Sequence, residues 1–437
     1  MTLQPTAAQA DLLTALARLG VASSAQLQAA LGKSQPTLSR TLRELAGRVV
    51  VLGQQRSARY ALLHDLLGLP GQQPLWWTDA DGAHHEWGQI NHLGQERLHV
   101  QAPGVDVLTQ GRLPWFLQPL RLQGFLGRLW ARSPQAQGYD SNPERWRIDQ
   151  LLALLLREVH DLPGAISLGP EFGDAISLAP ADLAARRAHH DAQADALIQA
   201  RPVGSSAGGE QAKFIARDAD GSGHLIVKYT PPRGTPFGER WHDLLHAEAL
   251  ALQVLGEHGV PVAGTRVLQS ARRTYLESTR FDRVGAKGRR HVVALDAVHE
   301  AFVPGPRQHW DHTCAALARQ RRLPASTADQ VRALRQFGRL IGNNDMHFGN
   351  LSLLVARPED IAAGRFQLAP VYDMLPMRWR PDPQTGDTWL TPFEPDLADL
   401  AGPARPVALA FWQRAEAHSP LSRPFRALAA TMIQRLK

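Results

Sequence analysis

Residues 1–63 combine helical apolar spacing with two short runs of strand-forming residues. Leucines recur every three or four positions in three segments, which Gly, Ser and Pro residues separate. The first segment stops at Gly20, the second opens on the capping-box pair Ser23 and Gln26, and Ser34 caps the third. Two apolar runs then flank a polar tip that contains Arg56 and Arg59. The pattern predicts three helices followed by a β-hairpin.

Three helices and a hairpin in this order predict a winged helix-turn-helix, so residues 1–63 are interpreted as a DNA-binding domain. Leu38, Leu42 and Leu45 of the third helix face inward, and its polar side chains therefore face outward. Small polar side chains and arginines suit contacts with bases and phosphates. The candidate DNA-binding residues are Gln35, Thr37, Ser39, Arg40, Arg43, Arg56 and Arg59. A dimerisation or docking module with a solvated outer face is the alternative.

Residues 64–185 show a weaker pattern. Several tryptophans with many Gly and Pro residues indicate short strands and turns, which predicts a compact β-rich unit. Apolar residues at helical spacing predict one helix from Glu144 to Val159. Two histidine pairs match no zinc spacing and are interpreted as surface residues: His84-His85 and His189-His190.

A loop of small residues at 204–209 precedes two strand patterns, 212–215 and 224–229. Lys228 lies on the second of them. A small-residue loop with a lysine on a following strand is how kinases cover nucleotide phosphates and supply a cation to them. Small residues also let backbone N–H groups approach phosphate oxygens. A Gly-rich hairpin turn and a solvated edge lysine are the alternatives.

A helix is predicted from Glu239 to His258, because leucines recur along it and Gly259 follows as its stop. Glu248 on this helix is the expected ion-pair partner of Lys228, and a solvated acid is the alternative. The next strand pattern, 274–283, leads into a connecting segment. A hinge that reads adenine through backbone groups would fall there.

The most informative stretch is 340–350, where an apolar segment runs into a polar, Gly-containing turn. Asp345 and Asn350 have the D-x-x-x-x-N spacing of protein-kinase catalytic loops, in which Asp accepts a substrate proton and Asn binds Mg²⁺. Asp373, on a strand-like segment downstream, would supply a second hard oxygen ligand. The alternative is that the polar residues are ordinary turn formers.

A strand-rich region, a hinge and a helical region follow one another in kinase order. The prediction is an α+β, two-lobed protein-kinase-like fold with an N-terminal winged helix-turn-helix and a mostly helical C-lobe. The predicted domains are 1–63 for DNA binding, 64–185 as a β-rich subdomain, 186–285 as the ATP-binding N-lobe, and 286–437 as the C-lobe with the catalytic and metal-binding loop.

Composition adds constraints on compartment and partners. A chain of 437 residues is long enough for two or three domains. A net charge of +7 favours a polyanionic partner such as nucleic acid or nucleotide. The single cysteine, Cys314, excludes a disulfide framework and suits a reducing cytosol as a buried thiol. Without a signal-peptide pattern or an apolar run near ~18 residues, a soluble, cytoplasmic protein with no membrane partner is expected.

Taken together, these residues resemble the HipA-type serine/threonine kinase toxins of bacterial toxin–antitoxin systems. The resemblance covers roughly residues 110–437, and a helix-turn-helix fused in front is similar to the YjjJ subgroup. The segments that carry it are Ser206-Ala207-Gly208-Gly209-x-x-x-Lys213, Ile226-Val227-Lys228, Arg280-Phe281-Asp282-Arg283, Gly342-x-x-Asp345-x-His347-x-x-Asn350-Leu351 and Tyr372-Asp373.

The resemblance implies that Asp345 is the catalytic base beside Asn350, and that Asn350 and Asp373 hold Mg²⁺. Ser206 falls at the family's inhibitory autophosphorylation serine, and Ser205 beside it is the alternative. The implied ATP-binding residues are Lys228, Ser206, Gly208, Gly209, Thr279, Phe281, Glu248 and His347. Known substrates of the family include aminoacyl-tRNA synthetases, but nothing in this sequence selects a substrate.

The expected function is therefore an Mg²⁺- and ATP-dependent protein serine/threonine kinase of toxin type that autophosphorylates and also binds DNA. The expected partners are ATP, a protein substrate, DNA and, on DNA, a second copy of the chain. One alternative is a transcriptional regulator whose kinase-like domain only senses nucleotide. Another is a small-molecule kinase of the aminoglycoside or choline type, which the loop at 204–209 disfavours.

Overall fold

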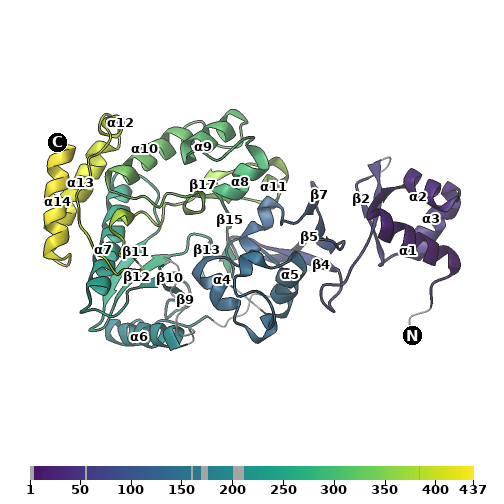
Figure 1. Ribbon diagram of the computed structural model, residues 1–437, viewed down its shortest axis with the longest axis horizontal. Coiled ribbons are helices and arrows are strands. Elements are labelled where there is room, and N and C mark those ends of the chain that lie inside the picture. Colours follow the sequence, from purple (N-terminus) through teal and green to yellow (C-terminus); the bar gives the residue numbers. More distant parts are fainter. Residues whose placement is uncertain (1–3, 55–56, 159–160, 169–175, 200–210, 383) are drawn as a thin grey trace.

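The computed structural model describes residues 4–54, 57–158, 161–168, 176–199, 211–382 and 384–437. The chain forms an elongated α+β protein with its N-terminal helices at one end and the C-terminal pair α13 and α14 at the other (Figure 1). The predicted α+β class is confirmed. Arg56 and the loop at 204–209 lie outside the described residues.

The N-terminal unit contains the three predicted helices and the predicted hairpin. Capping boxes at Thr6 and Ser23 start the first two helices, whereas the hydroxyl of Ser34 contacts Thr37 instead of capping a backbone N–H. A strand too short to show a pattern adds a third member to the hairpin. The elements are α1 (Ala7–Leu19), β1 (Val21–Ser23), α2 (Ser24–Leu31), α3 (Gln35–Glu44), β2 (Val49–Leu52) and β3 (Arg59–Leu62), with sheet order β1-β3-β2.

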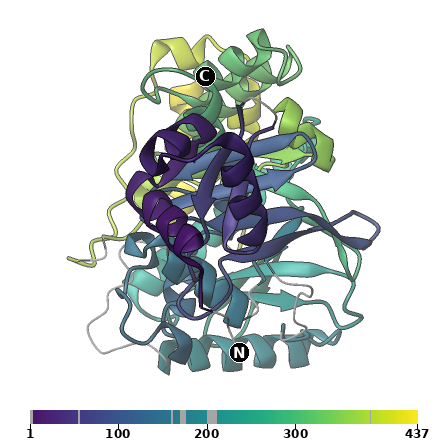
Figure 2. The ribbon, with the colours of Figure 1, turned by 90° about the vertical axis from the view of Figure 1, so that its right-hand side faces the viewer.

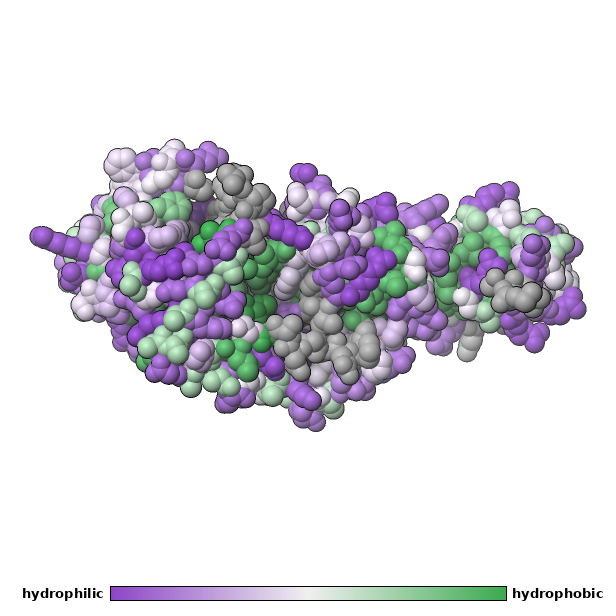
Figure 3. All heavy atoms as spheres, turned by 90° about the horizontal axis from the view of Figure 1, so that it is seen from below, coloured by the Kyte–Doolittle hydropathy of each residue, from purple (hydrophilic) through white to green (hydrophobic). Residues whose placement is uncertain are grey.

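The N-terminal unit is joined to the rest through the hairpin. Val50, Leu52 and Ala61 pack against Leu93, and the backbone N–H of Gly53 donates to the Asp106 carboxylate at 3.0 Å. Figure 3 shows the unit as a separate mass on the right, connected to the body by a narrow waist.

The predicted β-rich unit is a five-stranded antiparallel sheet with short helices. The helix predicted from Glu144 begins instead at Ile148, because Pro143 opens a 3₁₀ turn and Arg147 has extended backbone. The elements are β4 (Gln72–Thr78), β5 (His84–His92), β6 (Arg97–Ala102), β7 (Val105–Gln110), η2 (Trp115–Leu120), α4 (Gly124–Trp130), η3 (Pro134–Ala136), η4 (Pro143–Arg145), α5 (Ile148–Arg157) and β8 (Ile166–Leu168), with sheet order β7-β6-β5-β4-β8.

A second antiparallel sheet lies between two long helices, and its strand alternation decides where Lys228 points. Val227 and Tyr229 belong to the small core between the sheet and α6. Lys228 lies between them in the strand, so its side chain points to the opposite face of the sheet, toward α7. In Figure 2, α6 runs along the bottom of the molecule. The elements are α6 (Leu183–Gln199), β9 (Lys213–Arg217), β10 (His224–Tyr229), α7 (Pro236–Glu257), β11 (Thr265–Gln269) and β12 (Thr274–Thr279), with sheet order β11-β12-β10-β9.

The surface interpretation of the histidine pairs is wrong for His190, which is fully buried. Its ring contacts the Glu277 carboxylate at 2.7 Å, and Arg186 and Arg266 bind the same carboxylate. Burial alone would raise the pKa of Glu277, but hydrogen bonds from these three side chains lower it to about 2. His84 is half-buried and stacks on a tryptophan ring. The contacts of His190 and Arg186 with Glu277 thus secure α6 to the sheet.

The remaining chain is mostly helical, as predicted, around a small three-stranded sheet. Cys314 is fully buried there, and burial raises the pKa of its thiol to about 12. None of the described helices is long and apolar enough to cross a membrane. The elements are β13 (Arg283–Val284), β14 (Gly288–Arg289), β15 (His291–Ala294), α8 (Leu295–Phe302), α9 (Trp310–Arg319), α10 (Thr327–Leu340), η5 (Phe348–Asn350), β16 (Ser352–Val355), α11 (Pro358–Ala363), β17 (Gln367–Leu368), η6 (Met377–Trp379), α12 (Leu397–Leu400), α13 (Arg405–Ala417) and α14 (Arg423–Leu436).

Candidate active site

One cavity of about 540 Å³ brings together residues that are far apart in the chain. The second sheet and α7 supply one wall, and the loop after α10 and the segment after β17 supply another. Its polar lining includes Lys213, Lys228, Glu248, Asp345, His347, Asn350 and Asp373. The four residues on which the sequence interpretation depended, Lys228, Asp345, Asn350 and Asp373, therefore share one cavity.

Lys228 is held between two carboxylates. Its Nζ donates to Glu248 Oε1 at 2.6 Å and Oε2 at 2.7 Å, and also to Asp373 Oδ1. The side chains of Lys228 and Glu248 are 8% and 1% exposed, so the predicted ion pair is present and both solvated alternatives are wrong. All three N–H donors of the ammonium are used. A phosphate oxygen could contact Lys228 only by replacing one of these acceptors.

Burial and charge act in opposite directions on this group. Burial would lower the pKa of Lys228, but the carboxylates of Asp373 and Glu248 outweigh burial and raise it above its ordinary value. Burial raises the pKa of Glu248 more than the ammonium lowers it. For Asp373 the balance is reversed, because Lys228 and Lys213 lower its pKa more than burial raises it. The Lys228 ammonium and the Asp373 carboxylate are thus charged at neutral pH.

The loop that carries Asp345 is shaped by its backbone contacts. Gly342, at the end of α10, has φ 80°, and a Cβ there would lie 2.7 Å from the Trp379 ring. The buried Asn343 accepts the Asp345 N–H through Oδ1 at 3.0 Å. Asn350 Nδ2 donates to the Asp345 carbonyl at 2.8 Å. Both backbone groups of Asp345 are therefore satisfied without its carboxylate, which stays available at the cavity.

Asp373 does not lie on a strand, contrary to the sequence expectation. Its backbone has φ 51°, a left-handed conformation that costs an L-residue roughly 1–2 kcal/mol. Tyr372 secures the segment, because its hydroxyl donates to the Gly349 carbonyl at 2.8 Å and contacts Ser352 Oγ at 2.7 Å. The bend directs the carboxylate to Lys228 instead of continuing a sheet.

Lys213 is a site residue to which the sequence interpretation assigned no role. It begins β9 directly opposite Lys228 and lines the same cavity. Its charge helps to lower the pKa of Asp373. The available signal was its position just after the small-residue loop.

The remaining predicted nucleotide residues are only partly brought together. His347 lines the cavity, and its Nδ1 accepts the Gly349 N–H at 3.1 Å. Thr279 is exposed at the end of β12, and the Phe281 ring packs on Tyr372, with ring centres 5.6 Å apart. Neither of these two is among the residues that line the cavity. Ser205, Ser206, Gly208 and Gly209 lie outside the described residues.

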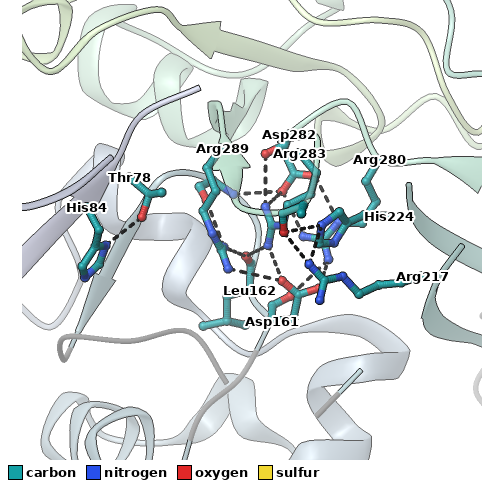
Figure 4. A network of polar contacts seen from close by, with 12 residues as sticks. Thr78, His84, Asp161, Leu162, Arg217, His224, Arg280, Asp282, Arg283 and Arg289 are labelled. Carbon is teal, nitrogen blue, oxygen red and sulfur yellow. Dashed lines mark hydrogen bonds and ion pairs between the residues drawn. The ribbon is translucent and has the colours of Figure 1, made fainter. Parts of the chain in front are cut away.

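The segment expected to be the hinge takes part in a buried charge network (Figure 4). Arg280 and Arg283 both bind Asp282, at 3.0 and 2.5 Å, and both also pair with Asp161 from the preceding unit. Arg289 contributes a further ion pair to Asp161 at 3.6 Å. Burial would raise the pKa of Asp282, but the arginines hold it well below its ordinary value. The network ties this segment to the first sheet.

The candidate DNA-binding residues lie on α3 and the hairpin. Arg40, Arg43 and Arg59 are exposed, whereas Thr37 and Ser39 are half-buried. Gln35 is exposed, but its Oε1 accepts hydrogen bonds from Ser24 and Gln28 of α2 at 2.5 and 2.7 Å. The structure therefore leaves the three arginines as the groups most available to a phosphate backbone.

The donors at the cavity fit Mg²⁺. This cation takes oxygen ligands and is commonly held by one or two carboxylates together with phosphate oxygens and water. Asp373 offers a charged carboxylate, and Asn350 uses its amide N–H on Asp345, which leaves its Oδ1 free to bind a cation. No cluster of three or more His, Cys, Asp or Glu side chains suited to a metal occurs in the described parts of the chain. The donors that are present thus suit a cation shared with a phosphate.

Comparisons with known proteins agree on one group of relatives. Residues 205–435 match the HipA-like C-terminal domain, and residues 69–176 match the middle domain of YjjJ-like toxins. Toxin YjjJ of Escherichia coli (strain K12) is 34% identical over 439 aligned residues, covering 97% of each chain. HipA of the Shewanella oneidensis MR-1 toxin–antitoxin system, solved with HipB and operator DNA, aligns with a TM-score of 0.50 at 15% identity, covering 83% of this chain and 95% of that one.

Proposed function

The chain belongs to the family of HipA-like proteins that includes Toxin YjjJ, and from that premise we propose that it is an Mg²⁺- and ATP-dependent protein serine/threonine kinase. The observation that carries this proposal is the convergence of Lys228, Asp345, Asn350 and Asp373 on one cavity. A base, a phosphate-binding cation and two oxygen ligands are the groups that phosphoryl transfer requires.

In the proposed mechanism, Asp345 accepts the proton of a substrate serine or threonine hydroxyl as the hydroxyl oxygen attacks the γ-phosphorus of ATP. The bond between the γ-phosphorus and its bridging oxygen breaks, and ADP leaves. Asn343 and Asn350 position Asp345 by binding its backbone. Lys228, oriented by Glu248, contacts the ATP phosphates, and Lys213 adds a second positive charge from the neighbouring strand. Asp373 and Asn350 would hold Mg²⁺, which neutralises charge on the transferring phosphate when bound.

We predict that the protein phosphorylates itself on the loop at 204–209. Mass spectrometry after incubation with ATP and Mg²⁺ is expected to find one phosphate on Ser206 or Ser205, because this loop precedes two lysines of the cavity. A phosphate adds about two negative charges to the loop. These charges would repel the phosphates of a bound nucleotide and so oppose nucleotide binding. The Ser206→Ala and Ser205→Ala variants distinguish the two positions. Phosphate found only elsewhere in the chain would contradict this assignment.

We also propose that α1 to β3 form a winged helix-turn-helix that binds DNA. Binding to a random-sequence duplex is expected to weaken steeply between 50 and 200 mM salt, as for any protein that contacts several phosphates. The Arg43→Ala and Arg59→Ala variants should each reduce the slope of log affinity against log salt by about one. Fluorescence anisotropy measures both effects.

A matched control for the DNA experiment is Arg319→Ala, an exposed arginine on α9 at a distance from the N-terminal unit (Figure 1). Its slope should equal that of the wild type. Equal slopes for all four proteins would show that α3 and the hairpin do not contact phosphate.

A further inference from the structure

Residues 381–396, which lead from the cavity wall to α12, have an unusual charge for this protein. The whole chain carries a net charge of +7, yet this segment contains four acids and no lysine or arginine. Two of the acids are neutralised within the protein, since Glu394 pairs with Arg435 at 3.2 Å and Asp396 pairs with Arg339. Asp382 and Asp387 form no ion pair with any described residue.

The first part of this segment, residues 381–382 and 384–391, is named the acidic hairpin. Its turn is closed by the Asp382 N–H, which donates to the Asp387 carbonyl at 3.0 Å. The Asp382 carboxylate accepts the N–H groups of Gln384 and Thr385 at 2.7 and 3.0 Å. These backbone hydrogen bonds lower the pKa of Asp382. The hairpin therefore presents negative charge at neutral pH.

The base of the acidic hairpin is attached to the cavity wall. Arg380, which immediately precedes it, lines the cavity, as does Trp241 on α7. Next to Trp241, the buried Arg240 donates to the Trp389 carbonyl at 3.2 Å, and Trp379 Nε1 donates to the Thr391 carbonyl at 3.0 Å. In Figure 2 the yellow-green chain that carries the hairpin projects from the side of the protein.

Trp389 is the exposed apolar group of the hairpin. Its side chain is 75% exposed, whereas every other tryptophan of the chain is buried or half-buried. Its backbone is fixed by Arg240, so the indole is presented from an anchored position. Tryptophan is enriched among the residues that contribute most to protein–protein binding, and its ring face attracts lysine and arginine side chains.

We propose that the acidic hairpin docks a basic segment of the protein substrate, with Trp389 taking a lysine or arginine side chain against its ring. Asp382 and Asp387 bind neighbouring positive charges of the same segment. Because the hairpin directly follows Arg380 on the cavity wall, a serine or threonine near that basic segment is delivered to Asp345. The proposal rests on the proposed kinase function for the delivery step, but not for the binding step.

Binding is tested first without catalysis. Two fluorescent serine peptides of equal length are compared, one with three arginines beside the serine and one with glutamates in their place. The full-length protein without ATP is expected to bind the basic peptide at least tenfold more tightly. Trp389→Ala should weaken that binding by about five- to thirtyfold, the range of one cation–π or anchor contact. Asp387→Asn should weaken it less.

The matched control is Leu397→Ala, which removes an 84% exposed apolar side chain just beyond the segment. It should leave peptide affinity unchanged. Since Trp389 is exposed, its variant should keep the unfolding midpoint of the wild type. Equal affinity of Trp389→Ala and wild type for the basic peptide would overturn the proposal. The proposal would also be overturned if, without peptide, Trp389→Ala had a different sedimentation mass from the wild type. That result would identify the hairpin as a self-association surface instead.

Phosphorylation assays separate this proposal from the kinase proposal. If the protein transfers phosphate, Trp389→Ala should raise KM for the basic peptide several-fold and leave kcat unchanged. Phosphate transfer with an unchanged KM would overturn docking and leave the kinase standing. Tight, Trp389-dependent peptide binding without any phosphate transfer would support docking and count against the kinase.

Discussion

The Asp345→Asn variant is expected to lose phosphate transfer from ATP by about 10²–10⁴-fold, the usual contribution of a positioned general base. An amide has nearly the same size as a carboxylate but cannot accept the substrate proton. The loop should keep its shape, because Asn343 and Asn350 bind the backbone of Asp345 and not its side chain. Transfer of labelled phosphate to the protein itself or to a basic peptide measures the loss.

A control for this variant is Asp329→Asn, which changes an exposed carboxylate on α10, 76% exposed, in the helix that leads into the loop. It should keep full activity. Asp345→Asn should also keep its DNA affinity and unfolding midpoint, since neither depends on the carboxylate. A variant that retained more than a tenth of wild-type transfer would exclude Asp345 as the base, whereas a wild-type protein without any transfer would favour a protein that only senses nucleotide.

Local spacing was enough to predict the parts of the site that lie close together in the chain. Asp345 and Asn350 are five residues apart on one turn, so their proximity follows from chain connectivity. The Lys228–Glu248 pair was also predictable, because strand alternation and helix periodicity each select a face. The strand limits at β10 agree with the pattern residue for residue.

Features that depend on distant contacts could not be read from the sequence. The left-handed backbone of Asp373 is maintained by contacts of Tyr372 with Ser352 and Gly349, which no local pattern shows. The contact of the expected hinge segment with Asp161 joins residues that are 119 positions apart in the chain, since Asp161 pairs with Arg280. His190 looked like a surface residue because its partner Glu277 lies on another element. The two-lobed arrangement, the winged helix and the domain boundaries stay predictions.

The Lys228→Met variant should lower the free energy of unfolding by about 3–5 kcal/mol at pH 8, the typical effect of removing one partner from a buried ion pair. Methionine fills similar volume, so the loss arises from charge and not from a cavity. The buried carboxylate of Glu248 and the half-buried carboxylate of Asp373 would be left without their ammonium. Lys287→Met, which changes an exposed lysine, should have almost no effect. Urea unfolding measures both.

The pH dependence identifies the cause of that loss. Burial already raises the pKa of Glu248 in the wild type, and removal of the ammonium raises it further. A folded-state pKa above the unfolded value means that the variant is penalised most at high pH and recovers as pH falls through the folded pKa. The free energy of unfolding of the variant should therefore differ less from that of the wild type at pH 5.5 than at pH 8. Adding Glu248→Gln to Lys228→Met should restore part of the stability at pH 8, because a neutral amide needs no counter-charge. Phosphate transfer should stay absent, because the double variant still lacks the Lys228 ammonium. A loss equal at both pH values, and not relieved by the second substitution, would assign the effect to packing instead of to charge.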